Sequence, residues 1–203
     1  MEKKYKLTDE TIEVFDKTLY RIEALKDFSN VKKGDKGGFI EKEENLSHLD
    51  DAWVYDNAKV FDNAIVRDDA AVFNDAKVFD NARVFDNATI CEDAIVSNNA
   101  VVYGNVIISD YAIIKDATIS GNADISHDAK ILSDKDYIVF KNWWSSGRYF
   151  TWTRSNNMWS VGCFYGTGEE LIEKAYKDSK LSGDEYKRIV DYVNSINNYE
   201  RKH

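Results

Sequence analysis

From Ala52 to Ile131, the hydrophobic positions recur with a fixed period of six residues. Alanine fills one position in thirteen of fourteen units, with Val106 in the other, and a branched aliphatic residue always follows two positions later. Apolar residues on a helix face recur every three or four positions, so a period of six predicts a solenoid of short strands and corners. The aliphatic residues are Val54, Val60, Val66, Val72, Val78, Val84, Ile90, Val96, Val102, Ile108, Ile114, Ile119, Ile125 and Ile131.

Each unit is expected to form one short strand and one corner of a triangular coil. The alanine and the aliphatic side chain both point into a narrow interior, which only small and branched residues fit. The residue before the alanine position is Asn or Asp in every unit but the one with Tyr111, and these residues tolerate left-handed backbone. We therefore expect that residue to turn the corner, with a shortened corner between Ala112 and Ala117.

This pattern resembles the hexapeptide-repeat family, in which an aliphatic residue and a small residue alternate with variable positions. The resemblance covers about 84 residues, 51–134, and implies a left-handed parallel β-helix. With the glycine-rich segment 37–47 before the repeats and the segment 161–167 after them, the chain also looks like uncharacterised repeat proteins frequent in bacteriophages and prophages. That second resemblance implies a phage or prophage origin and assigns no activity to particular residues.

The two ends lack the repeat and are expected to fold differently. Residues 1–50 mix strand-like runs with glycines and are interpreted as a β cap, because a solenoid end must be covered. Residues 135–203 are expected to form an α+β module with three strands, at 137–143, 148–154 and 158–164. Two helices should follow, and capping boxes predict that they begin at Thr167 and Ser182. The predicted fold class is mainly β.

Aromatic residues often occupy the position after the aliphatic one, which faces outward. Two interpretations compete: the rings stabilise the parallel strands or are covered by the terminal segments, or they form an interface for another protein or for further copies of the chain. The resemblance raises the expectation of a homodimer or homotrimer. The predicted interface residues are Tyr55, Phe61, Phe73, Phe79, Phe85 and Tyr103.

The formal net charge of −9 arises on the repeats, which hold 15 acidic and 6 basic residues. The corner acids serve backbone geometry or form an acidic surface for a basic protein. A nucleic-acid groove would concentrate Lys and Arg, so direct nucleic-acid binding is not expected. The chain has no apolar run of membrane-spanning length and no apolar signal segment, so we expect a cytoplasmic protein that does not enter a membrane.

The module also combines arginines with aromatic rings, a composition able to stack on and neutralise a nucleotide or another planar anion. The alternative is a small aromatic core with two surface arginines. The candidate ligand-binding residues are Trp144, Arg148, Tyr149, Trp152, Arg154 and Thr167.

An enzymatic role is considered and not favoured. Many hexapeptide-repeat proteins are acyltransferases with a His as general base. His127 is the histidine on the repeats, but no inserted loop closes a cleft around it, and Cys163 has no His near it in sequence. No catalytic residue, metal site or cofactor is predicted. The favoured hypothesis is a binding protein that inhibits a host defence protein; a nucleotide-sequestering protein and an acyltransferase are the alternatives.

Overall fold

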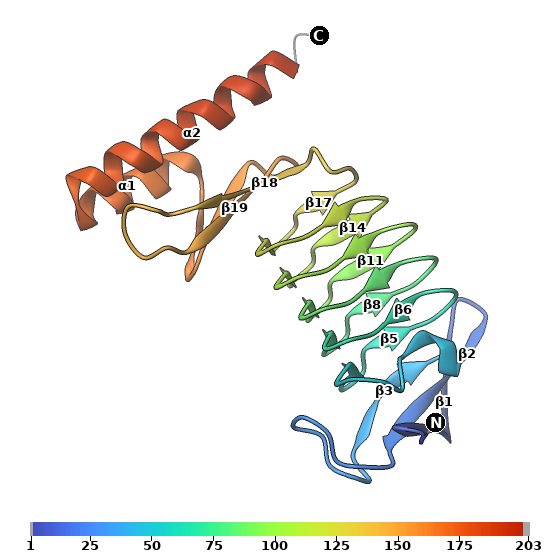
Figure 1. The fold of residues 1–203 in the computed structure, drawn as a ribbon. Helices are drawn as coiled ribbons and strands as arrows, with labels where there is room; N and C mark the ends of the chain where they lie inside the picture. Colours follow the sequence, from blue (N-terminus) through green and yellow to red (C-terminus); the bar gives the residue numbers. More distant parts are fainter. Residues whose placement is uncertain (1, 201–203) are drawn as a thin grey trace. The chain divides into compact units, whose positions relative to one another are not determined.

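The chain folds into two compact units, Met1–Asp134 and Lys135–His203. The structure is a computed structural model that describes the backbone of residues 2–200 and the side chains of residues 2–197. The first unit contains the repeats together with the N-terminal cap. The second unit contains an antiparallel sheet and two helices (Figure 1).

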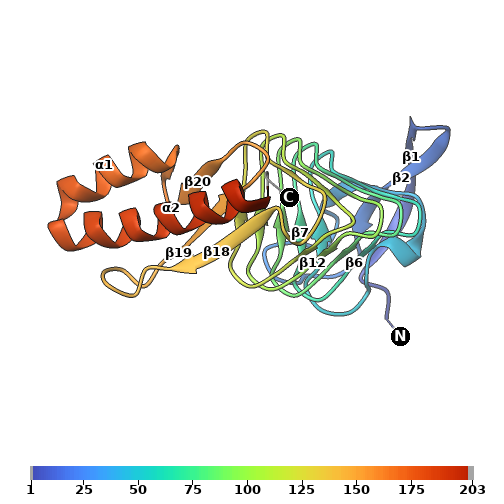
Figure 2. The same cartoon turned by 90° about the horizontal axis from the view of Figure 1, so that it is seen from above.

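The repeats form a parallel β-solenoid of about five turns, which is the predicted architecture. Each unit contributes a strand of two or three residues, and strands pair with those one coil away, as Val60 does with Val78 and Val78 with Val96. Figure 2 shows the coils stacked behind one another. The strands are β4 Trp53–Val54, β5 Lys59–Val60, β6 Ile65–Val66, β7 Ala71–Val72, β8 Lys77–Val78, β9 Arg83–Val84, β10 Thr89–Ile90, β11 Ile95–Ser97, β12 Val101–Val102, β13 Ile107–Ile108, β14 Ile113–Lys115, β15 Thr118–Ile119, β16 Asp124–Ile125 and β17 Lys130–Ile131.

Three sheets form the sides of the solenoid. The five-stranded sheet has the order β16-β13-β10-β7-β4, and the four-stranded sheet has the order β15-β12-β9-β6. The third, eight-stranded sheet joins the remaining coil strands to the N-terminal cap. The side chains at the alanine position and at the aliphatic position two residues later point inward in all fourteen units and are at most 2% exposed, so the predicted core is confirmed.

The predicted position of the corner was wrong by one residue. In every unit except that of Ala117, the left-handed residue lies two positions before the alanine position, as with Asp80 at φ 57°, and not directly before it. The amide of Ala82 donates to the carbonyl of Phe79, which closes a four-residue turn with Asp80 and Asn81 at its centre. The shortened corner has only Asp116, at φ 53°.

The N-terminal cap extends the eight-stranded sheet. Strands β1 (Tyr5–Val14), β2 (Lys17–Ala24) and β3 (Lys36–Ile40) pair antiparallel, and β3 then pairs in parallel with β5. Gly38 is required where β3 meets the first coil, because a Cβ there would lie 2.5 Å from the Ala58 carbonyl oxygen. A short 3-10 helix, η1 (Glu43–Asn45), leads into the repeats.

A buried lysine closes the open end of the first coil. The Lys4 ammonium donates to the carbonyl oxygens of Leu49, Asp50 and Ala52, at 3.3, 3.2 and 2.7 Å. Lys4 is 1% exposed, and its burial lowers the pKa of the ammonium to about 8. The cap thus supplies hydrogen bonds to carbonyls that have no preceding coil.

The C-terminal module has four strands where three were predicted. The order is β18 (Tyr137–Lys141), β19 (Tyr149–Thr153), β20 (Met158–Val161) and β21 (Phe164–Gly166), because a turn at Gly162, with φ 59°, divides the third predicted run. Helix α1 (Gly168–Asp178) begins at the predicted Thr167 cap. Helix α2 (Lys180–Glu200) begins before the predicted Ser182, because the Ser179 hydroxyl accepts the Ser182 amide at 3.0 Å.

Candidate functional site

The aromatic residues of the repeats stack in pairs along the coils. Partners are 18 residues apart and therefore lie on the same sheet in consecutive coils. Each pair is nearly parallel, so the rings support one another along the sheet. The ring centroids lie 4.3 Å apart in Tyr55 and Phe73, 5.0 Å in Phe61 and Phe79, and 5.1 Å in Phe85 and Tyr103.

The N-terminal hairpin, formed by β1 and β2, covers one of these pairs together with β3. Leu19 and Phe39 pack on Phe61, which is 1% exposed, and Phe15 at the hairpin turn lies 6.3 Å from Phe79. Phe61 was predicted to be an interface residue, but the hairpin leaves it no surface for a partner. One interpretation of the sequence was that the terminal segments cover the aromatic rings, and the structure shows this covering at Phe61 and Phe79.

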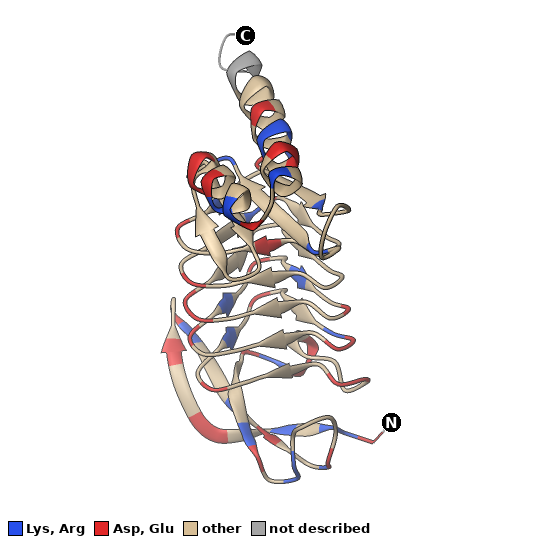
Figure 3. Cartoon of the chain, turned by 90° about the vertical axis from the view of Figure 1, so that its left-hand side faces the viewer, with Lys and Arg blue, Asp and Glu red and all other residues tan. Residues whose placement is uncertain are grey.

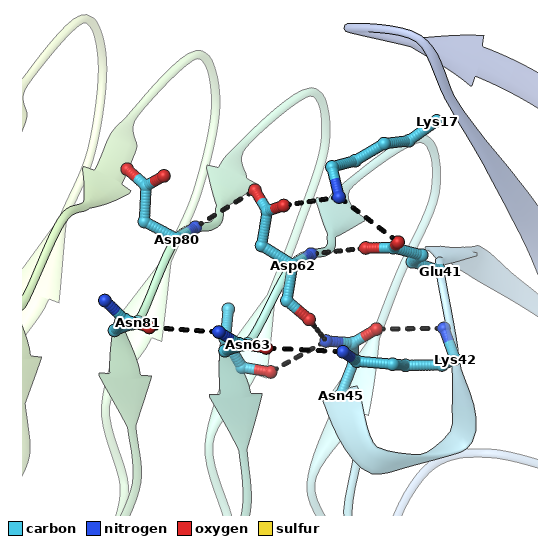
Figure 4. Close-up of polar contacts among 9 residues, drawn as sticks. Lys17, Glu41, Lys42, Asn45, Asp62, Asn63, Asp80 and Asn81 are labelled. Carbon is cyan, nitrogen blue, oxygen red and sulfur yellow. Dashed lines mark hydrogen bonds and ion pairs between the residues drawn. The ribbon is translucent and has the colours of Figure 1, made fainter.

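A polar network fixes the hairpin on the coils (Figure 4). The Lys17 ammonium lies 2.6 Å from Asp62 and 3.3 Å from Glu41, and these two carboxylates raise the pKa of Lys17. Glu41 also accepts the backbone amide of Asp62 at 2.6 Å. The cap therefore continues the hydrogen bonding of the corners, and we assign this region a structural role.

The pair on the four-stranded sheet lies among charges. The Arg67 guanidinium is 4.3 Å from the centroid of the Phe85 ring, and it also pairs with Asp68 at 2.8 Å. Arg83 is exposed on the same sheet. This sheet therefore presents a mixed surface of aromatic and cationic groups.

The five-stranded sheet presents a surface almost without charge, which we call the five-stranded face. Its outward positions lie beside the inward aliphatic residues, and Asp124 in the last strand is the single charged residue among them. Its N-terminal edge is covered, since Trp53 packs against Phe28 at 5.2 Å and Tyr55 donates to Asn30. The face comprises Ala71, Phe73, Thr89, Cys91, Ile107 and Ser109.

The side chains of this face differ in exposure. Ile107 is 46% exposed, whereas Phe73 and Cys91 are half-buried. Burial raises the pKa of the Cys91 thiol, so this thiol stays protonated at neutral pH. The face therefore consists mainly of apolar and small side chains.

Acidic residues follow the corners of the coils (Figure 3). Many of them accept the backbone amide of the equivalent residue one coil later, as Asp80 does from Asn98 at 3.0 Å and Glu92 from Asp110 at 2.9 Å. The neighbouring Asp110 raises the pKa of Glu92, because the two carboxyls share one column. The corner acids therefore serve backbone geometry and also create a band of negative charge.

His127 occupies one of these corners, at φ 59°. Its amide donates to Asp110 at 2.9 Å, and its Nδ1 lies 3.2 Å from the same carboxylate. An open hollow of about 250 Å³ beside it is lined by Asp110, Tyr111, His127 and Asp128. Within the described residues, no group of three or more His, Cys, Asp or Glu side chains is placed to hold a metal ion.

The C-terminal module contains a pocket of about 350 Å³, which we call the module pocket. One wall is the loop between β18 and β19, a second is formed by β20 and β21, and the third by α1 and α2. Two cations and one carboxylate meet there with two aromatic rings and several hydroxyls. The lining residues are Asn142, Ser145, Ser146, Arg148, Val161, Phe164, Leu171, Lys174, Ala175, Asp178, Ser182 and Tyr186.

The predicted ligand residues of the module do not converge. Arg148 lines the module pocket, but Trp152 is 1% exposed in the core, where Arg154 lies 5.9 Å from its ring. Thr167 and Glu170 satisfy each other at the start of α1, at 2.8 and 3.2 Å, so this helix end is already capped. Trp144 packs edge-on against Tyr186, and Tyr149 is exposed beside Lys141.

Sequence reasoning missed Lys174 and Asp178 on α1. Their signal was present, because Leu171, Lys174, Ala175 and Asp178 follow the spacing of one helix face. Two ionic residues in the apolar stripe of a helix mark the place where that helix borders a hollow.

A scan against models of known protein families finds no match, and a search of curated proteins finds none either. In the described part of the chain, neither helix combines the length and the apolar character that crossing a membrane requires.

Proposed function

We propose that this chain is a non-enzymatic binding protein of phage or prophage origin, and that it docks a host defence protein on the five-stranded face. Its solenoid is proposed to be a left-handed hexapeptide-repeat β-helix. The repeat pattern and the segments flanking it support the turn sense and the origin by resemblance. The docking role is supported by the chemistry of the face itself.

The observation that carries the proposal is the lack of charge on the five-stranded face. Charged residues make up 31% of the chain, yet five adjacent strands present one charged side chain between them. Depletion of charged residues is what distinguishes the buried centre of a protein interface from ordinary surface. Ile107 and Phe73 supply apolar area at that centre.

The corners beside the face define the partner. One corner column carries Asp56, Asp75, Glu92, Asp93 and Asp110 along its length. A partner with an apolar strip bordered by Lys and Arg would satisfy both the face and this column. A second copy would bring acidic columns near one another, so the charge favours a basic protein over self-association at this face.

The test compares two isoleucines that occupy the same position in two different sheets. Ile107 and Ile65 each begin a two-residue strand and are 46% and 39% exposed. A protein captured from bacterial lysate is purified, and its Kd is measured for the wild type, Ile107→Arg and Ile65→Arg. We expect Ile107→Arg to weaken binding by about 30-fold, the size of an interface hot spot, and Ile65→Arg to leave it nearly unchanged.

Three results would contradict this assignment. The two variants could bind equally, which would place the contact elsewhere. The Kd could be insensitive to salt, against the expected weakening as ions screen the corner charges. The molar mass in solution could show a dimer or trimer that Ile107→Arg dissociates, which would assign the face to self-association. Circular dichroism confirms that both variants keep the fold.

A further inference from the structure

We infer that the module pocket binds a small planar anion of the nucleoside monophosphate class. This inference concerns the second unit and goes beyond docking on the five-stranded face. It depends on the charges, the aromatic wall and the unsatisfied amide that surround the pocket.

Two cations at the pocket lack anionic partners. Within the described residues, neither Arg148 nor Lys174 forms an ion pair, although most lysines and arginines of the helices do. The Arg148 guanidinium lies against the turn at Gly162, where a Cβ would be 2.8 Å from Nη1. Two positive groups around one hollow favour an anionic group between them, and phosphate suits the planar donors of arginine.

The remaining walls favour a nucleoside. Phe164 lines the pocket with its ring 5.7 Å from the Lys174 ammonium, and it offers a surface on which a base can stack. Asp178 has no hydrogen bond or ion pair in the described structure, and a carboxylate in such a site accepts hydroxyls of a ribose. A volume of about 350 Å³ is at the size of pockets that hold small ligands.

An unsatisfied amide in the wall gives an independent indication. Asn142 is 5% exposed, its Nδ2 donates to the Tyr186 hydroxyl at 3.1 Å, and its Oδ1 has no partner. Because a tyrosine hydroxyl donates or accepts, either orientation of the amide leaves one polar atom unpaired. Buried polar atoms are nearly always paired, so an unpaired one beside a pocket indicates a missing ligand group.

The loop that carries these groups is held in place. The backbone amide of Asn142 donates to the backbone carbonyl of Arg148 at 2.7 Å, and the backbone amide of Gly147 donates to the backbone carbonyl of Asn142 at 2.9 Å. These two bonds close the loop between β18 and β19 and fix Asn142 and Arg148 relative to each other. A site whose groups are positioned before binding loses less entropy when the ligand arrives.

The experiment titrates the full chain with AMP, GMP, CMP and UMP, and with adenosine and inorganic phosphate as partial probes. Calorimetry gives the Kd, and tryptophan fluorescence reports the module, which holds four of the five tryptophans. At least one mononucleotide should bind, and both partial probes should bind at least tenfold more weakly, because each lacks one half of the contacts. Arg148→Met and Lys174→Met should each weaken mononucleotide binding by about tenfold or more.

Lys177→Met is the matched control, since Lys177 lies on the same helix, is exposed and does not line the pocket. It should bind as the wild type does. Binding of phosphate as tight as that of every mononucleotide would show only an anion site and would overturn the inference. The inference would also be overturned if no mononucleotide bound at millimolar concentration, or if Lys177→Met lost as much affinity as Arg148→Met and Lys174→Met. Binding of the captured protein should be unchanged in Arg148→Met, which separates this inference from the proposed function.

Discussion

The solenoid and the C-terminal module bury their polar groups in different ways. In the solenoid, each coil repeats the hydrogen bonds of the last, as in the amides of Phe61 and Phe79, which donate to carbonyls one coil later, each at 3.1 Å. The interior is filled by alanines and aliphatic residues that are at most 2% exposed. The module instead packs large rings such as Phe150, Trp152 and Trp159, and buries a side-chain amide at Asn142 whose oxygen has no partner.

This difference separates the two kinds of binding surface. A repeated interior leaves no room for a ligand, so the solenoid has only its outer faces to offer, and extended faces suit macromolecules. Irregular packing of a loop, a sheet and two helices leaves a hollow with converging polar groups, which suits a small molecule. Among the described residues of the repeats, the hydroxyl of Ser97 is buried without a partner where the Phe61 and Phe79 column ends.

The strongest way to break this comparison is to place a charge inside the repeat. Val78 is 0% exposed, and Val78→Asp would bury a carboxylate without a partner. We expect the solenoid to lose more than about 4 kcal/mol of unfolding free energy, because a buried charge of this kind is among the costliest substitutions. Far-UV circular dichroism should show the loss, while tryptophan fluorescence should still report a folded module.

The neighbouring residue on the same strand provides the control. Lys77 faces outward on β8, so Lys77→Asp should cost no more than about 1 kcal/mol. Equal destabilisation by the two substitutions would mean that the alternation of inward and outward side chains is wrong. Simultaneous loss of the module signal would mean that the two units unfold together.

The success of prediction followed the same division between the two units. Every alanine and aliphatic position of the repeat was assigned to the interior, because one pattern repeated over fourteen units leaves a single consistent packing. The covering of Phe61 was not resolved, since it depends on contacts between Leu19 and residues about forty positions later. The offset of the corner by one residue was missed because Asp and Asn occupy both corner positions, as in Asp80 and Asn81.

In the module, composition indicated a ligand but misplaced the residues around it. Arg148 was predicted and lines the pocket, whereas Trp152 and Thr167 have structural roles that no local pattern distinguishes from binding roles. The position of Asn142 depends on a loop conformation fixed by two hydrogen bonds, and a single sequence does not determine such a loop.

A smaller effect is expected at the capped end of the solenoid, where Lys4→Met removes the donor to three carbonyls. We expect a loss of about 2 kcal/mol at pH 7, because buried carbonyls without donors carry a desolvation cost. Denaturant unfolding followed by circular dichroism measures it. The same end differs from the interior of the repeat in that its stability responds to pH through a buried ionisable group.

The sign of that response follows from the pKa of Lys4, which burial lowers from 10.5 to about 8. Between these values the unfolded chain holds the proton and the folded chain does not, so the contribution of Lys4 to stability rises as the pH rises. Below about pH 8 both states are protonated, and the contribution is constant. Stability of the wild type relative to Lys4→Met should therefore increase from pH 8 to pH 10. A flat difference would show that the ammonium keeps an ordinary pKa.

The smallest effect sharpens the comparison by asking whether the corner acids act through charge or through geometry. Asp80 has φ 57°, and its carboxylate accepts the Asn98 amide at 3.0 Å. Asp80→Ala removes the acceptor and places Ala in a left-handed conformation, so it should cost about 1–2 kcal/mol by thermal unfolding. Asp80→Asn keeps both properties and should stay within about 0.5 kcal/mol, since Asn98 occupies the equivalent corner one coil later.

A loss in Asp80→Asn as large as that in Asp80→Ala would mean that the charge of Asp80 stabilises the corner. An unchanged Asp80→Asn variant would mean that the negative band beside the five-stranded face is free to serve a basic partner, because the fold requires only the hydrogen bond and the turn.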